Sequence, residues 1–469
     1  MFLDVDKRNA STVAAIDDDG LQMTYGDLSS FCVLMKDRLE TRKLAFILAE
    51  NSIGSFAGYI SMLSNKVVPL ILDSKMEKDL LGNLITMYRP YYYWVPSRMK
   101  SDFRGEVIFE DHGYALLQDT ENRDATVLYA DLALLLPTSG STGSSKLVRH
   151  SYRNIEASAR NVSQFFEFTD QDRGLVTLPM YYTMGLSVIT SHIYVGATIL
   201  LTKKSLTDAL FWTFLKEQRA TSFTGVPYSF EVLSRLRFFR MKLPDLRVIT
   251  QGGGKMREDL FQACAEYAET SGKKFIATYG QTEGTARMAY LPAELATRKI
   301  CSIGYAVPHG ELYLINEDKE ILTDKEATGQ LVYKGENVTL GYACCREDLE
   351  KGDERDGILY TGDLARRDAD GCYYIVGRMG RFLKLYGSRV GLDECENMIK
   401  SALGIECACV GDDECMLVYI TERDYLGQVL KLLEEKTRLI ASAFKGVIID
   451  AIPKNETGKV LYSQLKTKN

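Results

Sequence analysis

After the apolar run Leu134-Leu135-Leu136, the chain reads Pro137-Thr138-Ser139-Gly140-Ser141-Thr142-Gly143-Ser144-Ser145-Lys146. Glycines allow backbone N–H groups to converge on an anion, the Ser and Thr hydroxyls add donors, and the lysine supplies a positive charge. The stretch therefore predicts a phosphate-binding loop at the end of a buried strand. On its own it does not exclude a solvated Ser/Gly turn, because it lacks the Gly-Lys-Ser/Thr ending of the ordinary P-loop.

Strand-like and helical segments alternate around this loop through the first 300 residues or so. Apolar runs that predict buried strands occupy residues 43–48, 67–72, 134–137, 175–178, 197–201, 222–225, 248–251 and 275–279. Apolar residues at helical spacing occupy residues 155–166, 206–217 and 257–270. The alternation predicts an α/β fold, with parallel-rich sheets covered by helices and ligands at the C-terminal ends of strands. Gly252-Gly253-Gly254 and residues 280–283 also follow such strands.

The pattern changes after about residue 312 to short strands and turns, which predicts a small β-rich subdomain that completes the large domain. Asp368-Ala369-Asp370-Gly371 is a hairpin-turn signal. Gly377-Arg378-Met379-Gly380 then resembles a hinge, and a new alternation of helices and strands follows it. We expect helices over residues 392–403 and 426–437, and strands over 382–385, around 408, over 416–420 and over 447–450. We therefore expect an N-terminal domain over residues 1–376, a hinge over 377–380 that includes Gly380, and a small mobile α+β domain over 381–469.

Composition narrows the classes of function. The 469 residues are 46% hydrophobic and 26% charged, typical of a soluble globular protein, and the net charge of −6 gives no electrostatic footprint for nucleic acid. The apolar stretch over residues 184–201 is interrupted by polar residues, so we expect a buried helix followed by a buried strand and no membrane insertion.

The number and spacing of cysteines and histidines disfavour a zinc site and a secreted, disulfide-bonded protein. The ten cysteines form no paired Cys-x-x-Cys units, which disfavours zinc and predicts reduced thiols in a cytoplasmic protein. The N-terminus is charged too early for a signal peptide. Only four histidines occur, which disfavours histidine-centred catalysis; His150 follows the phosphate loop, and a helix-capping or surface role is its simpler interpretation.

Four blocks in a fixed order carry a resemblance to a known family. They are the phosphate loop, Tyr279-Gly280-Gln281-Thr282-Glu283, Tyr360-Thr361-Gly362-Asp363 followed by Gly377-Arg378, and Pro453-Lys454-Asn455-Glu456-Thr457-Gly458-Lys459. In this order and spacing they resemble the acyl-adenylate-forming superfamily, which includes acyl-CoA synthetases, peptide-synthetase adenylation domains and firefly luciferase. The resemblance covers nearly the whole chain.

The resemblance implies roles in binding ATP and Mg²⁺. The phosphate loop, with Thr138, Ser139, Gly140, Ser141, Thr142, Gly143 and Lys146, would hold the β- and γ-phosphates. Thr282 would contact the α-phosphate, and Glu283 would bind Mg²⁺ through carboxylate oxygen. Adenosine would lie against Gly252, Gly253, Gly254, Tyr279 and Gly280, and its ribose would contact Asp363 and Arg378. The simpler interpretations are a surface carboxylate for Glu283, a turn around Asp363 and a solvated charge for Arg378.

The resemblance also implies how the chemistry is divided. Lys459 would bridge the substrate carboxylate and the α-phosphate during adenylation, while Lys454 is expected to be solvated. The small domain would then rotate so that residues 384–389, with Lys384 and Gly387, replace Lys459 and admit a thiol. Relatives usually carry Asp or Lys at the position of Gly380.

The segment Pro179-Met180-Tyr181-Tyr182-Thr183-Met184-Gly185 differs from the family pattern, in which a histidine occupies the position of Tyr182. We expect Tyr182 and Gly185 to line the substrate or thiol channel, although Tyr182 is equally plausible as a core residue. The aspartate with which amino-acid-activating relatives hold the substrate ammonium is missing here, which disfavours an ordinary α-amino acid.

We therefore expect an ATP-dependent ligase that converts a carboxylic acid to acyl-AMP with release of pyrophosphate. A thiol of coenzyme A, or the phosphopantetheine of an acyl carrier protein, would then accept the acyl group. Two alternatives stay open: transfer of the acyl group to an amine, and a non-catalytic nucleotide-binding homologue. A luciferase-type monooxygenase is a remote alternative.

Overall fold

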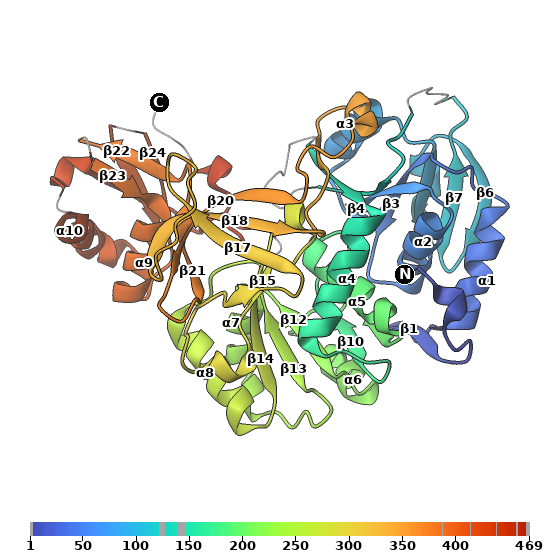
Figure 1. Cartoon of the computed structure of the whole chain (residues 1–469), viewed down its shortest axis with the longest axis horizontal. Helices are drawn as coiled ribbons and strands as arrows, with labels where there is room; N and C mark the ends of the chain where they lie inside the picture. Colours follow the sequence, from blue (N-terminus) through green and yellow to red (C-terminus); the bar gives the residue numbers. More distant parts are fainter. Residues whose placement is uncertain are drawn as a thin grey trace.

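The structure is a computed structural model that describes residues 3–121, 127–137, 146–386, 388–412, 414–437, 439–455 and 458–465. Figure 1 shows the N-terminal half of the chain at the right of the view and the C-terminal residues as a separate small unit at the left. Two large sheets and their helices make up the right and the bottom of the view. Residues 138–145 of the phosphate loop and Gly387 lie outside the described residues.

The first large sheet has nine strands, and its central six are parallel. In sheet order the strands are β16 (Tyr305–Ala306), β15 (Ala289–Tyr290), β14 (Lys274–Tyr279), β13 (Val248–Gln251), β12 (Ser222–Gly225), β10 (Arg173–Val176), β11 (Thr198–Leu201), β1 (Val13–Asp17) and β2 (Gln22–Thr24). The antiparallel strands β2, β15 and β16 form the two edges. The parallel strands are buried apolar runs, as expected for a sheet covered on both faces.

The second large sheet has eight strands around a parallel core of four. In sheet order they are β19 (Gly341–Ala343), β9 (Leu147–Ser151), β8 (Leu132–Pro137), β4 (Val68–Asp73), β3 (Leu44–Ala49), β5 (Tyr92–Pro96), β7 (Tyr114–Gln118) and β6 (Glu106–Asp111). Because β8 and β9 pair antiparallel, with Pro137 opposite Leu147, the phosphate loop connects the two strands of a hairpin.

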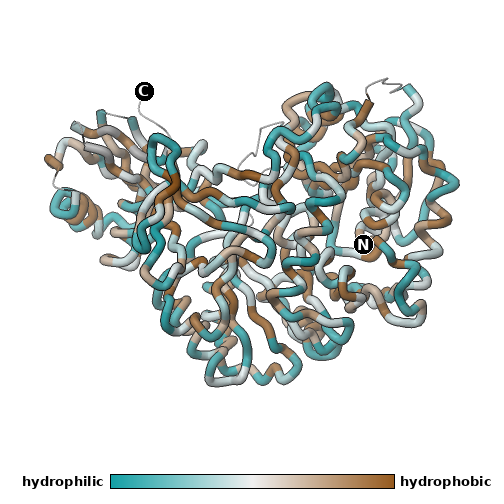
Figure 2. Tube along the Cα trace, in the orientation of Figure 1, coloured by the Kyte–Doolittle hydropathy of each residue, from teal (hydrophilic) through white to brown (hydrophobic). Residues whose placement is uncertain are grey.

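Helices fill the space between the two sheets and cover their outer faces. The helices are α1 (Tyr25–Lys36), α2 (Ile53–Ser64), α3 (Lys78–Tyr88), α4 (Tyr152–Phe166), α5 (Thr183–Val195), α6 (Ala209–Glu217), α7 (Pro227–Arg235), α8 (Glu258–Thr270), α9 (Leu392–Leu403) and α10 (Leu426–Thr437). One core cluster joins α2, α4 and α5 to strands of both sheets, a second packs α6, α7 and α8 on the nine-stranded sheet, and a third packs α3 on the eight-stranded sheet. Figure 2 shows the hydrophobic residues concentrated along the inner strands.

A four-stranded antiparallel sheet follows: β17 (Gly310–Ile315), β18 (Ala327–Gly335), β20 (Ile358–Arg367) and β21 (Tyr373–Arg378). The small C-terminal unit has its own core, built from α9, α10 and the strands β22 (Phe382–Leu385), β23 (Ser388–Gly391), β24 (Cys407–Gly411), β25 (Met416–Ile420) and β26 (Phe444–Ile448). Within the described ranges, no helix combines the length and apolarity needed to cross a bilayer.

This architecture confirms the expected α/β fold class with a β-rich subdomain and a small C-terminal α+β unit. The apolar stretch over residues 184–201 is a buried helix that leads into a buried strand, α5 and β11. The last strand was predicted at residues 447–450 and lies at Phe444–Ile448. Lys445 and Gly446 hid its start in the sequence, because Gly446 is needed where Leu426 of α10 packs against the strand.

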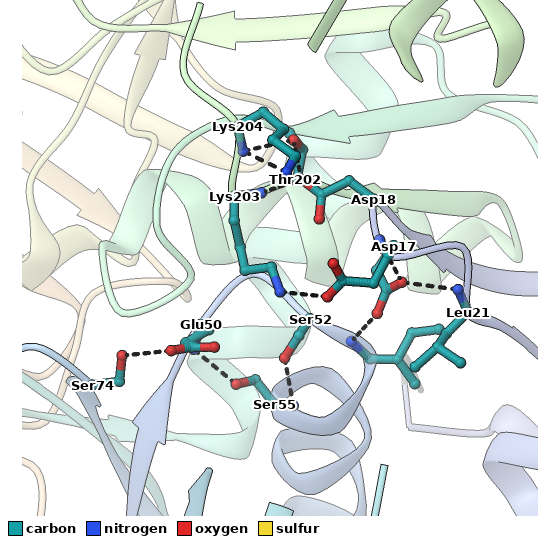
Figure 3. A network of polar contacts seen from close by, with 12 residues as sticks. Asp17, Asp18, Leu21, Glu50, Ser52, Ser55, Ser74, Thr202, Lys203 and Lys204 are labelled. Atoms are coloured by element: carbon teal, nitrogen blue, oxygen red, sulfur yellow. Dashed lines mark hydrogen bonds and ion pairs between the residues drawn. The ribbon is translucent and has the colours of Figure 1, made fainter. Parts of the chain in front are cut away.

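Polar side chains tie the two large sheets together at the C-terminal ends of their strands (Figure 3). Asp17 ends β1, and its carboxylate accepts from the backbone N–H of Leu21 and, at 3.4 Å, from that of Ile53 at the start of α2. Asn51 donates to the carbonyls of Val176, Leu178 and Thr202 and accepts from Met180 N–H. These bonds fix the segment that leads to Tyr182.

Candidate functional site

Thr282 and Glu283 lie in a 3-10 turn, η4 (Thr282–Gly284), just beyond the end of β14. The turn folds back so closely that a Cβ at Gly280 would lie 1.6 Å from the carbonyl oxygen of Ala286, so this position requires glycine. The Glu283 carbonyl accepts from the backbone N–H and the hydroxyl of Thr339, at 3.0 and 2.9 Å. The Glu283 side chain is therefore presented from a rigid backbone.

The Glu283 carboxylate lies beside the last residue of the phosphate loop. Its Oε1 accepts from the Tyr342 hydroxyl at 2.7 Å, and the Lys146 ammonium lies 3.4 Å from the centre of the same tyrosine ring. Burial and the negative charge of Glu283 raise the pKa of Tyr342 to about 12, so the phenol stays protonated and donates. The structure thus brings Lys146 and Glu283 together through Tyr342.

Thr282 is buried, and its Oγ1 accepts from the Thr183 hydroxyl at 3.0 Å. Thr183 is the first residue of α5, so the hydroxyl predicted to contact the α-phosphate is positioned by the helix that carries Tyr182 at its N-cap. The segment before the helix packs against its first turn, because a Cβ at Gly185 would lie 2.3 Å from the Pro179 carbonyl oxygen. Gly185 therefore has a packing role.

Asp363 is a buried carboxylate surrounded by donors. Oδ1 accepts from Arg378 Nε at 2.9 Å, and Oδ2 accepts from Gln281 Nε2 at 2.8 Å and from the Tyr279 hydroxyl. Burial, together with the adjacent Asp363 charge, raises the pKa of Tyr279 well above its ordinary value, which keeps this donor protonated. Asp363 and Arg378 face each other on β20 and β21, so Asp363 lies within a strand, and Arg378, whose side chain is 52% exposed, forms an ion pair with it.

The loop at Gly252, Gly253 and Gly254 leaves β13 beside Tyr182. A Cβ on Gly253 would lie 2.8 Å from the Tyr182 hydroxyl oxygen. Tyr182 itself packs against Leu178 and Val226, so it is partly a core residue. The same ring adjoins the glycine loop predicted to receive adenosine.

Lys459 of the small domain faces this group of residues. Burial lowers the pKa of Lys459, with a further decrease from Arg378, whereas Glu283 and Asp363 act in the opposite direction. Its turn is closed by a bond from Lys459 N–H to Asn455 Oδ1 at 2.9 Å. Lys454 forms an ion pair with Glu406, so it is not simply solvated.

The first two residues of the predicted hinge belong to a strand. β21 continues through Arg378, whose backbone N–H donates to Asp393 of α9 at 3.1 Å. Gly380 follows in a turn with φ of +105°, a value that L-residues rarely adopt. Lys384 lies on the β22–β23 hairpin, and Tyr386 at the tip of this hairpin contacts Ser442 of the same small domain.

The surface interpretation of His150 is wrong. His150 is fully buried on β9, its Nδ1 lies 3.3 Å from Thr285 Oγ1, and burial lowers its pKa to about 3. The cap of α4 is the next residue, Ser151.

Comparisons with known proteins show the family of this chain. The AMP-binding enzyme family matches residues 5–343. The indoleacetate–CoA ligase of Aromatoleum aromaticum is 30% identical over 76% of this chain and 70% of its own length. The 2-succinylbenzoate–CoA ligase of Bacillus subtilis is 25% identical over 98% of this chain and 88% of its own.

Solved structures share the fold over the whole chain. O-succinylbenzoate CoA synthetase (MenE) of Bacillus subtilis, in complex with its acyl-adenylate intermediate OSB-AMP, matches with a TM-score of 0.81 at 21% identity, over 100% of this chain and 98% of that one. The same synthetase has been solved with ATP and a magnesium ion, and a double mutant of it with the product analogue OSB-NCoA. The expected superfamily and the expected type of enzyme, an acid–thiol ligase that forms an acyl-adenylate and a CoA thioester, are confirmed at the level of the family. This chain belongs to the AMP-binding enzyme family.

Proposed function

We propose that this protein activates a carboxylic acid with ATP as an acyl-adenylate and transfers the acyl group to the thiol of coenzyme A. The observation that carries the proposal is the position of Lys459. A lysine of the small domain lies close enough to Glu283 and Asp363 of the large domain to be affected electrostatically by both. A cation placed there can stabilise the charge that develops when a carboxylate attacks the α-phosphorus.

The residues around Lys459 fit a nucleotide. Asp363 offers two acceptor oxygens, as ribose hydroxyls require, and its donors Gln281 and Arg378 hold it in place. The absence of a Cβ at Gly253 lets the glycine loop approach the Tyr182 hydroxyl closely, and we propose that the flat base lies against this loop. We assign Thr282 to the α-phosphate, and Lys146 to the leaving pyrophosphate.

The chemistry of Glu283 fits Mg²⁺, the ion found with ATP in the related MenE structure. Its carboxylate is partly exposed and forms no ion pair with a lysine or arginine of the described residues, so its charge is available to a cation. Carboxylate oxygen is the ligand that Mg²⁺ prefers, and the bound ion would neutralise the phosphates during attack. Tyr342 fixes the orientation of the carboxylate by donating to Oε1.

Thioester formation requires a thiol to approach from the side that Lys459 occupies. We propose that a turn of the small domain about Gly380 removes Lys459 and brings residues 384–389 to the site. Coenzyme A is the proposed acceptor because the relatives are named CoA ligases. A phosphopantetheinyl carrier protein or an amine is the alternative acceptor.

The test is pyrophosphate release by the purified protein with ATP, Mg²⁺ and a panel of carboxylic acids, with and without coenzyme A. The panel holds aryl, arylacetic, short aliphatic and dicarboxylic acids. The proposal predicts acid-dependent pyrophosphate release, and formation of a CoA thioester that consumes the adenylate. Release that does not depend on any acid would contradict adenylation, and acyl-adenylate that accumulates despite coenzyme A would exclude CoA as the acceptor.

A further inference from the structure

Arg287 is a buried cation with unsatisfied donors. Its side chain is 2% exposed, and burial lowers its pKa to about 9. Nη1 donates to the Ser187 hydroxyl of α5, whereas Nε and Nη2 have no hydrogen-bond partner in the described part of the chain. No carboxylate there lies within ion-pairing distance of it. The guanidinium carbon also lies 5.2 Å from the centre of the Phe166 ring, a contact that does not neutralise the charge, so the site favours binding of an anion.

The chain contains a matched counterexample in Arg149. Arg149 is also fully buried, yet it donates to the carbonyls of Tyr342, Leu340 and Lys351 and pairs with Glu354. The protein therefore gives the buried guanidinium of Arg149 a carboxylate and carbonyl acceptors, but leaves two donors of Arg287 without an acceptor.

The backbone that carries Arg287 is strained and held in place. Thr285 and Ala286 both have positive φ, at 48° and 77°, although neither is glycine. The Thr285 carbonyl accepts from Ser158 at 2.6 Å, and the Thr285 hydroxyl donates to the Asn337 carbonyl at 2.7 Å. Strain of this kind persists where the surroundings enforce it, and it clusters at functional sites. Here it turns the chain inward after Glu283, so that Arg287 points into the protein.

The guanidinium lies next to the proposed reaction centre. Its partner Ser187 is one turn along α5 from Thr183, whose hydroxyl contacts Thr282. Residues four apart on a helix have Cβ atoms about 5–6 Å apart. Tyr182 at the start of the same helix is affected by the charge of Arg287.

We propose that Arg287 binds a second carboxylate of the acid substrate, and so selects acids that carry an anionic group a few bonds from the carboxylate that is activated. The unsatisfied Nε and Nη2 are neighbouring donors on one edge of the planar guanidinium, which is the fork geometry that a carboxylate accepts. This inference rests on the proposed ligase function and specifies its substrate class. Arg287 is then a specificity-determining residue of the acyl pocket.

The first experiment compares thermal unfolding of the ligand-free wild type with that of Arg287→Met and Arg149→Met. Removing a cation that lacks a counter-ion should leave the Tm unchanged or raise it, whereas Arg149→Met, which removes four hydrogen-bonding partners, should lower the Tm by several degrees. Arg287→Gln serves as the second variant if Arg287→Met does not fold. A decrease for both Arg287 variants as large as that for Arg149→Met would show a structural role and overturn the proposal.

The second experiment measures kcat/KM for pyrophosphate release with acids paired so that they differ by one carboxylate, for example 2-succinylbenzoate and 4-oxo-4-phenylbutanoate, or glutarate and butanoate. For at least one pair, the wild type should prefer the dicarboxylate by about 100-fold or more, and Arg287→Met should lower kcat/KM for the dicarboxylate until that preference is lost. Equal or faster turnover of the monocarboxylates by the wild type would overturn the proposal. If no acid releases pyrophosphate, the ligase function itself fails, and the stability comparison still decides the role of Arg287.

Discussion

Gly380 offers the sharpest test of movement between the two domains. Its φ of +105° places it where an L-residue is strained, and no atom would lie within 4 Å of an added Cβ, so a substitution acts only through the backbone. Strain of this type costs about 1–2 kcal/mol. Gly380→Ala should therefore reduce the population of the conformer with Lys459 at the site by about 5- to 30-fold. Adenylation should slow by up to that factor.

The same variant should leave thioester formation from pre-made acyl-AMP unchanged or faster, because that step uses another conformer. Although relatives usually carry Asp or Lys here, the positive φ predicts that Gly380→Asp behaves like Gly380→Ala, and that Gly380→Pro is more severe. Gly404→Ala is the matched control, since Gly404 in the same domain has a φ of +70° and also has open space around it. It should lower stability and leave the ratio of the two half-reactions unaltered. Equal loss of both half-reactions in Gly380→Ala, or no loss of either, would refute a pivot at this residue.

Three further predictions concern the cation sites. Glu283→Gln should raise the Mg²⁺ concentration needed for half-maximal adenylation by about tenfold or more, because the amide keeps the shape of the ligand and loses its charge; an unchanged Mg²⁺ titration would count against Glu283 as the ligand. Tyr342→Phe removes the hydrogen bond to Glu283 Oε1 and should raise the Mg²⁺ concentration needed for half-maximal adenylation by about fivefold, the equivalent of about 1 kcal/mol. Thermal unfolding would check that this variant keeps its fold. The lowered pKa of Lys459 predicts that the adenylation rate declines at a pH below the ordinary lysine range, because only the protonated ammonium stabilises the phosphoryl charge. Lys459→Arg should move this decline to higher pH. A decline at the same pH in the variant would show that another group titrates.

Local periodicity predicted most of the fold. Helices over residues 392–403 and 426–437 and the strand over 416–420 agree with the structure at both ends, because their apolar residues repeat at helical or strand spacing between clear breaks. The start of β26 was missed, since Gly446 is required by a contact with another helix and leaves no strand signal. The antiparallel edges of the large sheets were also missed, because strand direction depends on pairing partners far away in the sequence.

The site was predictable only where its residues lie in contiguous blocks. Glu283, Asp363 and Lys459 stand in such blocks, and the structure places all three near one another. Tyr342 was missed because it contacts Glu283 from 59 positions away and belongs to no motif. Arg287 was missed because only the burial of its side chain distinguishes it from an ordinary surface arginine. The roles given to residues 138–143 fall outside the described residues, as does Gly387, and stay predictions.

Separate measurement of the two half-reactions in Lys459→Ala tests the central claim most directly. The claim is that Lys459 acts in adenylation alone. Pyrophosphate release from acid and ATP should fall by about two orders of magnitude or more, which corresponds to about 3 kcal/mol of transition-state stabilisation. Thioester formation from pre-made acyl-AMP and coenzyme A should continue, and Lys454→Ala in the same segment, where the lysine pairs with Glu406, should leave both steps intact. Normal adenylation in Lys459→Ala, or an equal loss of both steps, would contradict the account.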